Sequence, residues 1–228
     1  MSIRRRLIAS ISTAILGCAA LVALASPAQA VAVTNLVNNA EAGQNAFDTS
    51  SNAATGAAYG LVSPNGWHVA GSAATSYLNW STASLEQNHE YASFAFVVRV
   101  NSHAVGESVD LFSLKHTASV NHFDFFLTAG NDFMWDLKST DFDTYTGVTL
   151  GRWYLVKGKV FFGATTYTAE VEIDGVNQGS IASTSQTVEA VKSVWLGNAV
   201  AKTSDRDYDA IRVQVGETDP GWVAGGTL

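Results

Sequence analysis

Residues 152–180 read RWYLVKGKVFFGATTYTAEVEIDGVNQGS, and this stretch decides the fold. Apolar and polar residues alternate in both halves, so each half predicts a strand with one buried face. Asp174-Gly175 predicts a tight turn after the second strand, because both residues tolerate positive φ. Such a strand pair must bury its apolar face against a second sheet, which predicts an all-β, two-sheet antiparallel sandwich.

The same alternation predicts which side chains are buried between the sheets and which are exposed. The expected exposed residues are Arg99, Lys157, Glu170 and Glu172. The expected core residues are Phe94, Phe96, Val98, Val156, Val160, Val171 and Ile173.

Other apolar runs at short intervals predict further strands, and no helical period interrupts them. Residues 44–60 are rich in Ala, Ser, Asn, Thr and Gly and predict a long surface loop. The further strands are expected at residues 31–37, 67–69, 77–80, 94–100, 111–114, 123–127, 133–137, 193–196 and 208–215.

Residues 1–30 have the pattern of a signal peptide. Arg4-Arg5-Arg6 precede an apolar run, and Ala28-Gln29-Ala30 forms a small-residue cleavage site. The arginines leave both the general secretory and the twin-arginine routes open. We therefore expect a secreted, extracellular protein with a β-sandwich at 31–217 and a C-terminal tail at 218–228, and no membrane span in the mature chain.

The net charge limits the classes of partner that we expect for the mature chain. Without residues 1–30, ten basic and 20 acidic residues remain, a net charge of −10. Phosphate backbones repel such a surface, so nucleic acid is excluded as an expected partner.

Cys18, in the expected signal peptide, is the only cysteine, so the mature protein has no disulfide and depends on core packing, with a metal as a further means of support.

Four motifs follow one another in the second half of the sequence: Gly151-Arg152-Trp153-Tyr154-Leu155-Val156, Ile173-Asp174-Gly175, Val194-Trp195-Leu196-Gly197 and Tyr208-Asp209-Ala210-Ile211-Arg212-Val213. Their order is similar to that of the laminin-G-like, concanavalin A-like jelly rolls over residues 91–215, which implies two curved antiparallel sheets in a single domain. Family members include lectins, glucanases, polysaccharide lyases and adhesion domains, so the fold does not fix the activity.

The opening residues 35–43 are similar to the start of several carbohydrate-binding β-sandwich modules, with Ala40 in place of the usual aromatic residue. In related sandwiches a glutamate of this segment and an aspartate of the last strand often hold a structural calcium ion. Glu41 and Asp209 match those positions, so the resemblance implies a calcium site there. Backbone carbonyls and waters would complete the about six to eight oxygens that calcium needs. We expect no organic cofactor.

Three carboxylates at alternate positions, Glu170, Glu172 and Asp174, suggest the catalytic row of retaining glycosidases. The catalytic order in glycosidases of this fold is E-x-D-x-E, whereas here it is E-x-E-x-D with the aspartate before a turn glycine. An acidic strand face that ends in a turn residue explains the pattern better.

Lyase and metal motifs are also incomplete. Residues 154–158 resemble the tyrosine-lysine-glycine strand of jelly-roll lyases, but the spacing is one residue too long and no Gln-Ile-His partner exists. His116, His122 and Asp124 could share a metal, but their spacing is not that of a zinc site, and polar turn histidines explain them better. We assign no catalytic residue.

Aromatic residues are the best indication of a ligand, because sugar rings stack on aromatic planes. Trp153, Trp195 and Tyr167 are expected in the core, from their family positions or apolar parity. The candidates for a glycan groove are Trp67, Trp80, Trp135, Tyr145 and Tyr208.

These features favour a secreted, non-catalytic jelly-roll module that binds a glycan or polysaccharide by aromatic stacking and hydrogen bonds. Two alternatives stay open: a polysaccharide-degrading hydrolase or lyase on the same fold, and an extracellular adhesion or structural domain. The sequence favours no particular glycan and no particular oligomeric state.

Overall fold

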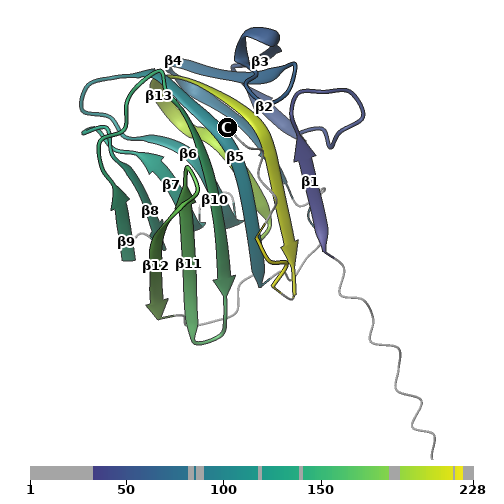
Figure 1. Ribbon diagram of the computed structural model, residues 1–228, viewed down its shortest axis with the longest axis vertical. Helices are drawn as coiled ribbons and strands as arrows, with labels where there is room; N and C mark the ends of the chain where they lie inside the picture. Colours follow the sequence, from purple (N-terminus) through teal and green to yellow (C-terminus); the bar gives the residue numbers. More distant parts are fainter. Residues whose placement is uncertain are drawn as a thin grey trace, which may run out of the picture. The chain divides into compact units, whose positions relative to one another are not determined.

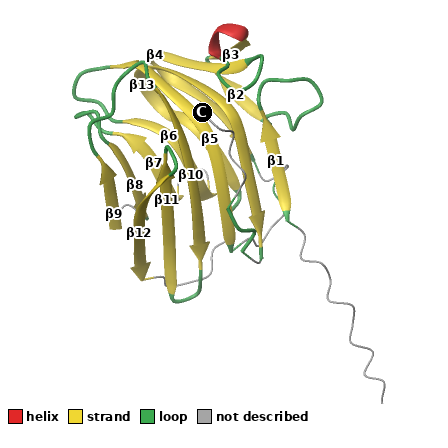
Figure 2. Cartoon of the chain, viewed as in Figure 1, coloured by secondary structure: helices red, strands yellow, loops and turns green. Residues whose placement is uncertain are grey.

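The computed structural model is a jelly-roll sandwich of antiparallel strands (Figures 1 and 2). It describes residues 33–222 apart from 82–84, 86–89, 118–119, 139–140, 185–190 and 218, so the expected signal peptide lies outside the described residues. Within these ranges the helical content is one 3₁₀ turn, η1 (Ala57–Tyr59), and no helix is long and apolar enough to cross a membrane. The strands are β1 (Thr34–Asn38), β2 (Thr49–Ser51), β3 (Ala53–Gly56), β4 (Gly66–Trp80), β5 (Tyr91–His103), β6 (Val109–Thr117), β7 (Val120–Leu127), β8 (Phe133–Leu137), β9 (Asp141–Tyr145), β10 (Trp153–Phe162), β11 (Thr166–Ile173), β12 (Val176–Thr184) and β13 (Ser193–Gly216).

Two long strands, β4 and β13, pass through both sheets. The first sheet runs β12-β11-β10-β5 to residues 204–216 of β13, which pair on their other side with β1 and the start of β4. The second sheet runs from the end of β4 through residues 194–198 of β13 to β6-β7-β8-β9. The strands β10, β5 and β13 of the first sheet lie side by side in Figure 1.

The expected division of these long strands was wrong, because residues 67–69 and 77–80 belong to one strand, as do 193–196 and 208–215. Ala73 has φ 51° in β4, and the register between β4 and β13 shifts between Asn198 and Ser204. Such irregularities bend a strand without ending its pairing. Each strand therefore turns from one sheet into the other.

Residues 44–60 also differ from the expected loop, since they contain β2, β3 and η1. Both short strands pair with β4. An edge strand needs only backbone hydrogen bonds on one side, so this segment can pair although it has few large apolar residues.

The core between the sheets follows the predicted alternation. All seven residues expected there are at most 2% exposed. Phe94 of β5 packs on Phe112 of β6 and Phe123 of β7, with ring centroids 4.2 and 5.3 Å apart. Gly158 of β10 makes room for Phe94, because a Cβ there would lie 2.2 Å from the Phe94 Cζ atom.

The residues expected to be exposed lie on the outer face of the first sheet, which is turned away from the core, but they are only half-exposed. Lys157 Nζ and Glu172 Oε1 are 2.9 Å apart across β10 and β11. The predicted turn is confirmed, with φ of 51° at Asp174 and 80° at Gly175.

Truncation of Val171 to alanine should lower the free energy of unfolding by about 1–3 kcal/mol, because it removes two buried methyl groups and leaves a cavity. Glu170→Ala, one residue away on the opposite face, should change it by less than about 0.5 kcal/mol. Urea unfolding of both variants measures the difference, and equal effects would contradict the assigned parity.

Candidate functional site

The outer face of the first sheet has a row of polar side chains that crosses four strands. His68 on β4 lies opposite Asp207 on β13. Arg99 on β5 lies opposite Asp207 on one side and Trp153 of β10 on the other. Directly opposed residues of antiparallel strands project to the same side, so these four side chains form one line. We call His68, Asp207, Arg99 and Trp153 the polar row.

Asp207 is the centre of the polar row, and its side chain is 1% exposed. Its Oδ1 lies 2.8 Å from His68 Nδ1. Its Oδ2 accepts hydrogen bonds from Arg99 at 2.6 and 2.9 Å and from Asn101 at 2.8 Å. A buried carboxylate is stable only with such partners, so Arg99 and Asn101 fix the orientation of Asp207.

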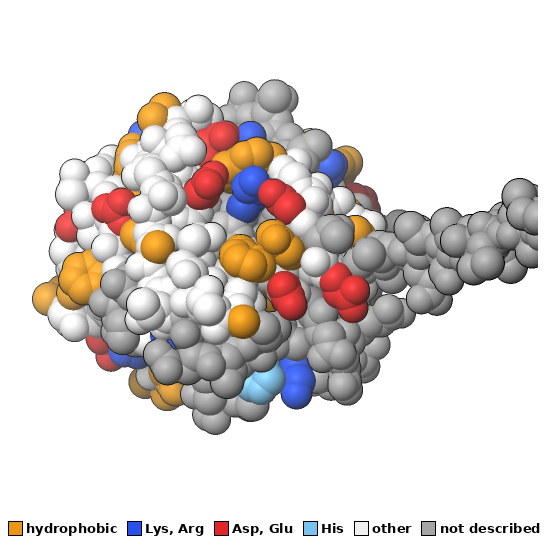
Figure 3. All heavy atoms as spheres, turned by 90° about the horizontal axis from the view of Figure 1, so that it is seen from below, with side chains coloured by type: hydrophobic (Ala, Val, Ile, Leu, Met, Phe, Trp, Pro, Cys, Tyr) orange, Lys and Arg blue, Asp and Glu red, His pale blue; other side chains and the backbone are white. Residues whose placement is uncertain are grey.

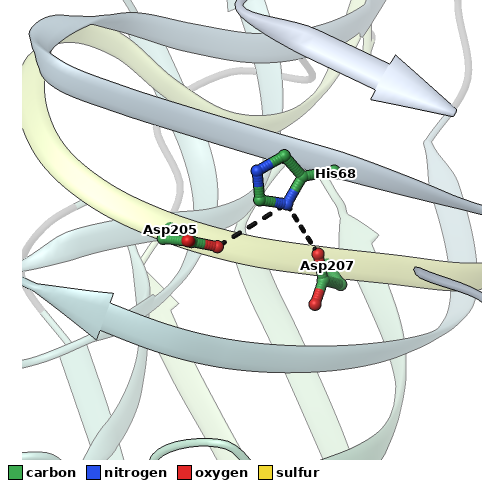
Figure 4. A group of neighbouring side chains, drawn as sticks. All are labelled: His68, Asp205 and Asp207. Atoms are coloured by element: carbon green, nitrogen blue, oxygen red, sulfur yellow. Dashed lines mark hydrogen bonds and ion pairs between the residues drawn. The ribbon is translucent and has the colours of Figure 1, made fainter. Parts of the chain in front are cut away.

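Asp205 adds a second carboxylate beside His68 (Figure 4). It lies two residues before Asp207 on β13, and its Oδ1 is 3.6 Å from His68 Nδ1. Asn101 donates to this oxygen at 2.8 Å, so one amide holds both carboxylates. Among the described residues this is the one group of three His, Cys, Asp or Glu side chains whose ligand atoms lie within 4.8 Å of one another. His116, His122 and Asp124 do not form such a group, although the ring centroids of His116 and His122 lie 5.4 Å apart. The expectation of turn histidines was wrong, because His116 lies in β6 and the fully buried His122 in β7.

Aromatic rings border both ends of the polar row. Tyr59 of η1 stacks on His68 with ring centroids 4.6 Å apart. At the other end, the Arg99 guanidinium lies 4.7 Å from the Trp153 ring centroid. The expectation that Trp153 is a core residue was wrong, because it has the opposite parity to the buried Tyr154.

Trp195 was also expected in the core, and it lies half-buried instead. Its ring contacts Tyr77 at 4.6 Å between centroids and the Lys115 ammonium at 4.9 Å. Tyr167 is fully buried, as expected.

A pocket of about 190 Å³ lies at the opposite end of the same outer face. Two stacked rings, Tyr91 of β5 and Phe161 of β10, form part of its wall, with centroids 4.6 Å apart. Tyr91 is eight residues from Arg99 along β5, or about 26 Å at ~3.3 Å per residue. We call this the aromatic pocket, and its polar wall consists of Lys159, Thr168, Glu170 and Asp219.

Charges in the aromatic pocket are partly paired. Lys159 Nζ lies 3.2 Å from Asp219 Oδ2 and 5.5 Å from the ring of Trp222. A hydrogen bond from the Gly221 backbone N–H, and then the nearby Lys159, lower the pKa of Asp219, so this carboxylate is ionised at neutral pH. Figure 3 shows the molecule from below. On the described part of that face, exposed hydrophobic side chains lie among acidic and basic ones, and there is no continuous basic area.

A second pocket, of about 270 Å³, brings two predicted residues together, because Glu41 and Trp67 both line it. Trp67 is half-buried and donates from Nε1 to Asn38 Oδ1 at 2.8 Å, and the ring of Phe47 meets it edge-on at 5.3 Å. Part of the Trp67 ring therefore remains accessible. We call this the Trp67 pocket.

Three of the other aromatic candidates were wrong, because Trp80, Trp135 and Tyr208 have no exposed surface with which to stack on a sugar. Burial raises the pKa of Tyr208 to about 12, and its hydroxyl donates to the Leu111 carbonyl at 2.9 Å. Tyr145 is half-buried against the core and lines neither pocket described above.

Glu41 and Asp209 bind the same segment, residues 61–65. Asp209 is fully buried, and its Oδ2 accepts from the backbone N–H groups of Leu61, Val62 and Ser63 at 2.6–3.0 Å. Glu41 Oε1 accepts from the backbone and side-chain amides of Asn65 at 2.9 and 3.2 Å. The opening segment and the last strand are thus joined through one loop.

Oxygen atoms converge beside this loop. The Ser63 hydroxyl lies 2.7 Å from the Asn65 carbonyl, 3.4 Å from the Asn39 carbonyl, and within hydrogen-bond distance of Asp209 Oδ1. One hydroxyl proton serves one of these acceptors well, whereas a cation can be shared by all of them. Both carboxylates also accept hydrogen bonds from within the protein, since Asp209 Oδ1 accepts from the Ala210 backbone N–H at 2.6 Å, and the predicted calcium site stays a prediction.

Two of the three carboxylates in the acidic strand row are explained by structural contacts, and the third, Glu170, lines the aromatic pocket. Glu172 pairs with Lys157. Asp174 accepts hydrogen bonds from Arg152 at 2.6 Å and from the backbone N–H of Leu155 at 2.9 Å. Both carboxylates therefore support the β10–β11 hairpin.

Sequence reasoning did not identify the His68, Asp205 and Asp207 group, because its members lie far apart in the chain and meet only through the β4–β13 register. Tyr91 and Phe161 were also missed as a pair. Their outward parity could have indicated them, since Phe161 alternates with the predicted inward residues of β10.

Comparisons with solved structures support the fold. No protein-family model and no curated protein matches the sequence. The cellulose induced protein Cip1 superposes with a TM-score of 0.59 at 10% identity, over 82% of this chain and 100% of that one. Domain 4 of AbnA, an extracellular arabinanase from Geobacillus stearothermophilus solved with arabinotriose, gives 0.51 at 17% identity, over 81% and 82%.

The receptor-binding domain of botulinum neurotoxin type G gives a TM-score of 0.51 at 9% identity, over 75% of this chain. The chain spans only 42% of that toxin domain. At these identities the likeness shows a shared jelly-roll sandwich.

If calcium binds between Glu41 and Asp209, it should raise the melting temperature, because an ion bound only by the folded state stabilises it by RT ln(1 + [L]/Kd). Thermal melting of residues 31–228 in excess calcium and in EDTA measures the shift. Glu41→Gln should abolish the shift. Superimposable curves, or a shift that survives Glu41→Gln, would contradict the site.

Proposed function

We propose that the chain is an exported, non-catalytic module that binds carbohydrate, and that the aromatic pocket is its glycan site. One observation supports this most directly: the stacked Tyr91 and Phe161 rings lie beside hydrogen-bonding groups from Lys159, Thr168 and Glu170 on an open sheet face. Aromatic rings offer a surface for the apolar face of a sugar, and the polar groups reach its hydroxyls.

Structural likeness supports the same class of function. The AbnA domain is described in complex with arabinotriose, and another similar structure, with a TM-score of 0.51, concerns a botulinum neurotoxin type C that interacts with two ganglioside molecules. This chain spans 42% of that toxin structure, so the AbnA domain is the closer support for a glycan site on this fold, although fold alone does not fix the activity.

The charge of the aromatic pocket favours uncharged sugars. Lys159 is paired with Asp219, while Glu170 adds a further negative charge. The mature chain is acidic overall, which disfavours polyanionic glycans at a distance. We therefore expect binding to neutral polysaccharides and not to polyuronates.

Binding should be measured on a glycan array that includes neutral and uronic-acid polysaccharides, and then by calorimetry with the best ligand. Phe161→Ala should weaken affinity about five- to tenfold, because an aromatic contact contributes on the order of 1 kcal/mol. Phe142→Ala, at a 64% exposed ring on β9, is the matched control and should bind normally.

The outcomes separate the function from its location. A uniformly negative array would contradict carbohydrate binding. If Trp67→Ala loses affinity and Phe161→Ala does not, carbohydrate binding is supported but the glycan site is the Trp67 pocket and not the aromatic pocket.

One observation favours the alternative of a polysaccharide lyase, because the polar row places an imidazole and a guanidinium around one carboxylate. A lyase needs a base and a cation that neutralises the sugar acid. As the module is proposed to be non-catalytic, a polysaccharide panel should yield no reducing ends and no unsaturated-sugar absorbance. Product formation that disappears in His68→Ala would establish the enzyme instead.

A further inference from the structure

We propose that His68, Asp205 and Asp207 bind a divalent transition-metal ion, with zinc as the best fit. The three side chains point toward one another from the adjacent strands β4 and β13 (Figure 4). One ligand atom from each lies within 4.8 Å of the other two. The imidazole comes from one strand and both carboxylates from the next, so the sheet itself sets their spacing.

The contact between His68 and Asp205 has the spacing of a zinc shell. Zinc binds imidazole nitrogen and carboxylate oxygen at about 2.0–2.2 Å, so two ligands of a tetrahedral shell lie about 3.3–3.5 Å apart. His68 Nδ1 is 3.6 Å from Asp205 Oδ1, close to this spacing. It is 2.8 Å from Asp207 Oδ1, a hydrogen-bond distance, and this contact opens by about half an ångström when the ion replaces the shared proton.

The carboxylates are already held by outer partners, as metal ligands usually are. Asn101 donates to Asp205 Oδ1 and to Asp207 Oδ2 at 2.8 Å. Arg99 holds Asp207 Oδ2, which leaves Oδ1 directed at His68. The stacked ring of Tyr59 fixes the plane of the imidazole.

The arrangement is open on its solvent side. The Asp207 side chain is 1% exposed, whereas those of His68 and Asp205 are 26% and 39% exposed. Water or a ligand oxygen can therefore complete the shell, as in zinc sites with three protein ligands.

Donor chemistry distinguishes this ion from calcium. An imidazole and two carboxylates suit zinc and its neighbours, whereas calcium requires about six to eight oxygens. The predicted calcium ligands Glu41 and Asp209 bind the loop at residues 61–65 and are not members of this group. The two ions can therefore be tested separately.

Charge provides a second argument for a cation. Two carboxylates side by side repel each other unless a positive charge lies between them. Arg99 offsets the charge of Asp207 through Oδ2, whereas the ion-pair contact of Asp205 is with His68. The charge of Asp205 is therefore offset either by an imidazolium or by a bound cation. The competing interpretation is an imidazolium that bridges the two acids without any metal.

Calorimetry on EDTA-treated, tag-free protein distinguishes these interpretations. The wild type should bind one equivalent of Zn²⁺, and His68→Ala and Asp205→Asn should each weaken binding at least tenfold. Substitution with Co²⁺ should give a visible absorption spectrum with the intensity of a four- or five-coordinate site, which does not depend on any activity. Melting curves show whether each variant folds.

Two matched controls should bind zinc normally. His103→Ala removes a histidine of β5 whose Nε2 contacts Asn131 and not the group. Glu41→Gln removes a predicted calcium ligand. Absence of zinc binding in the wild type, or unchanged affinity in folded His68→Ala, overturns the metal site and leaves the imidazolium bridge.

Discussion

One face of β5, β10 and β11 must be buried against the second sheet, because the described residues 33–222 contain no cysteine with which to cross-link the layers. Phe94 belongs to this contact: it packs on Phe112 and lies over Gly158, where a side chain would collide with its ring. Once this parity is fixed, every alternate residue must point outward. The polar row and the aromatic pocket are both made from those outward residues, so the surface chemistry depends on the core.

Strand parity was predictable from the sequence because it depends only on local alternation. The continuity of β4 and β13 was not, because a strand that bends through a bulge has the same local composition as two strands with a turn between them. The difference lies in the pairing partners. Both parts of β13 pair with β4 on one side, but on the other side residues 193–195 pair with β6 and residues 204–216 with β5. Pairing partners are a long-range property, and alternation does not specify them.

The candidate site was less predictable, for a related reason. His68 and Arg99 stabilise the buried carboxylate of Asp207, and they come from β4 and β5, the strands on either side of β13. Parity places each of these side chains on the outer face but does not determine their alignment, which depends on register. For Trp153, in contrast, the sequence pattern was sufficient. Its position in the alternation of β10 places it on the outer face, and the expectation of a core position came from the family resemblance.

The outer face also shows why polar side chains are concentrated there without weakening the sheet. Lys157 and Glu172 neutralise each other across β10 and β11, and Arg99 neutralises Asp207 across β5 and β13. Paired charges of this kind keep the surface hydrated and disfavour its association with apolar surfaces of other molecules. The binding sites proposed on this face are the places where charge pairing is incomplete or where aromatic rings are exposed. The two ends of β5 meet these conditions in different ways: one end has two carboxylates around a single imidazole, and the other has two stacked rings beside Glu170.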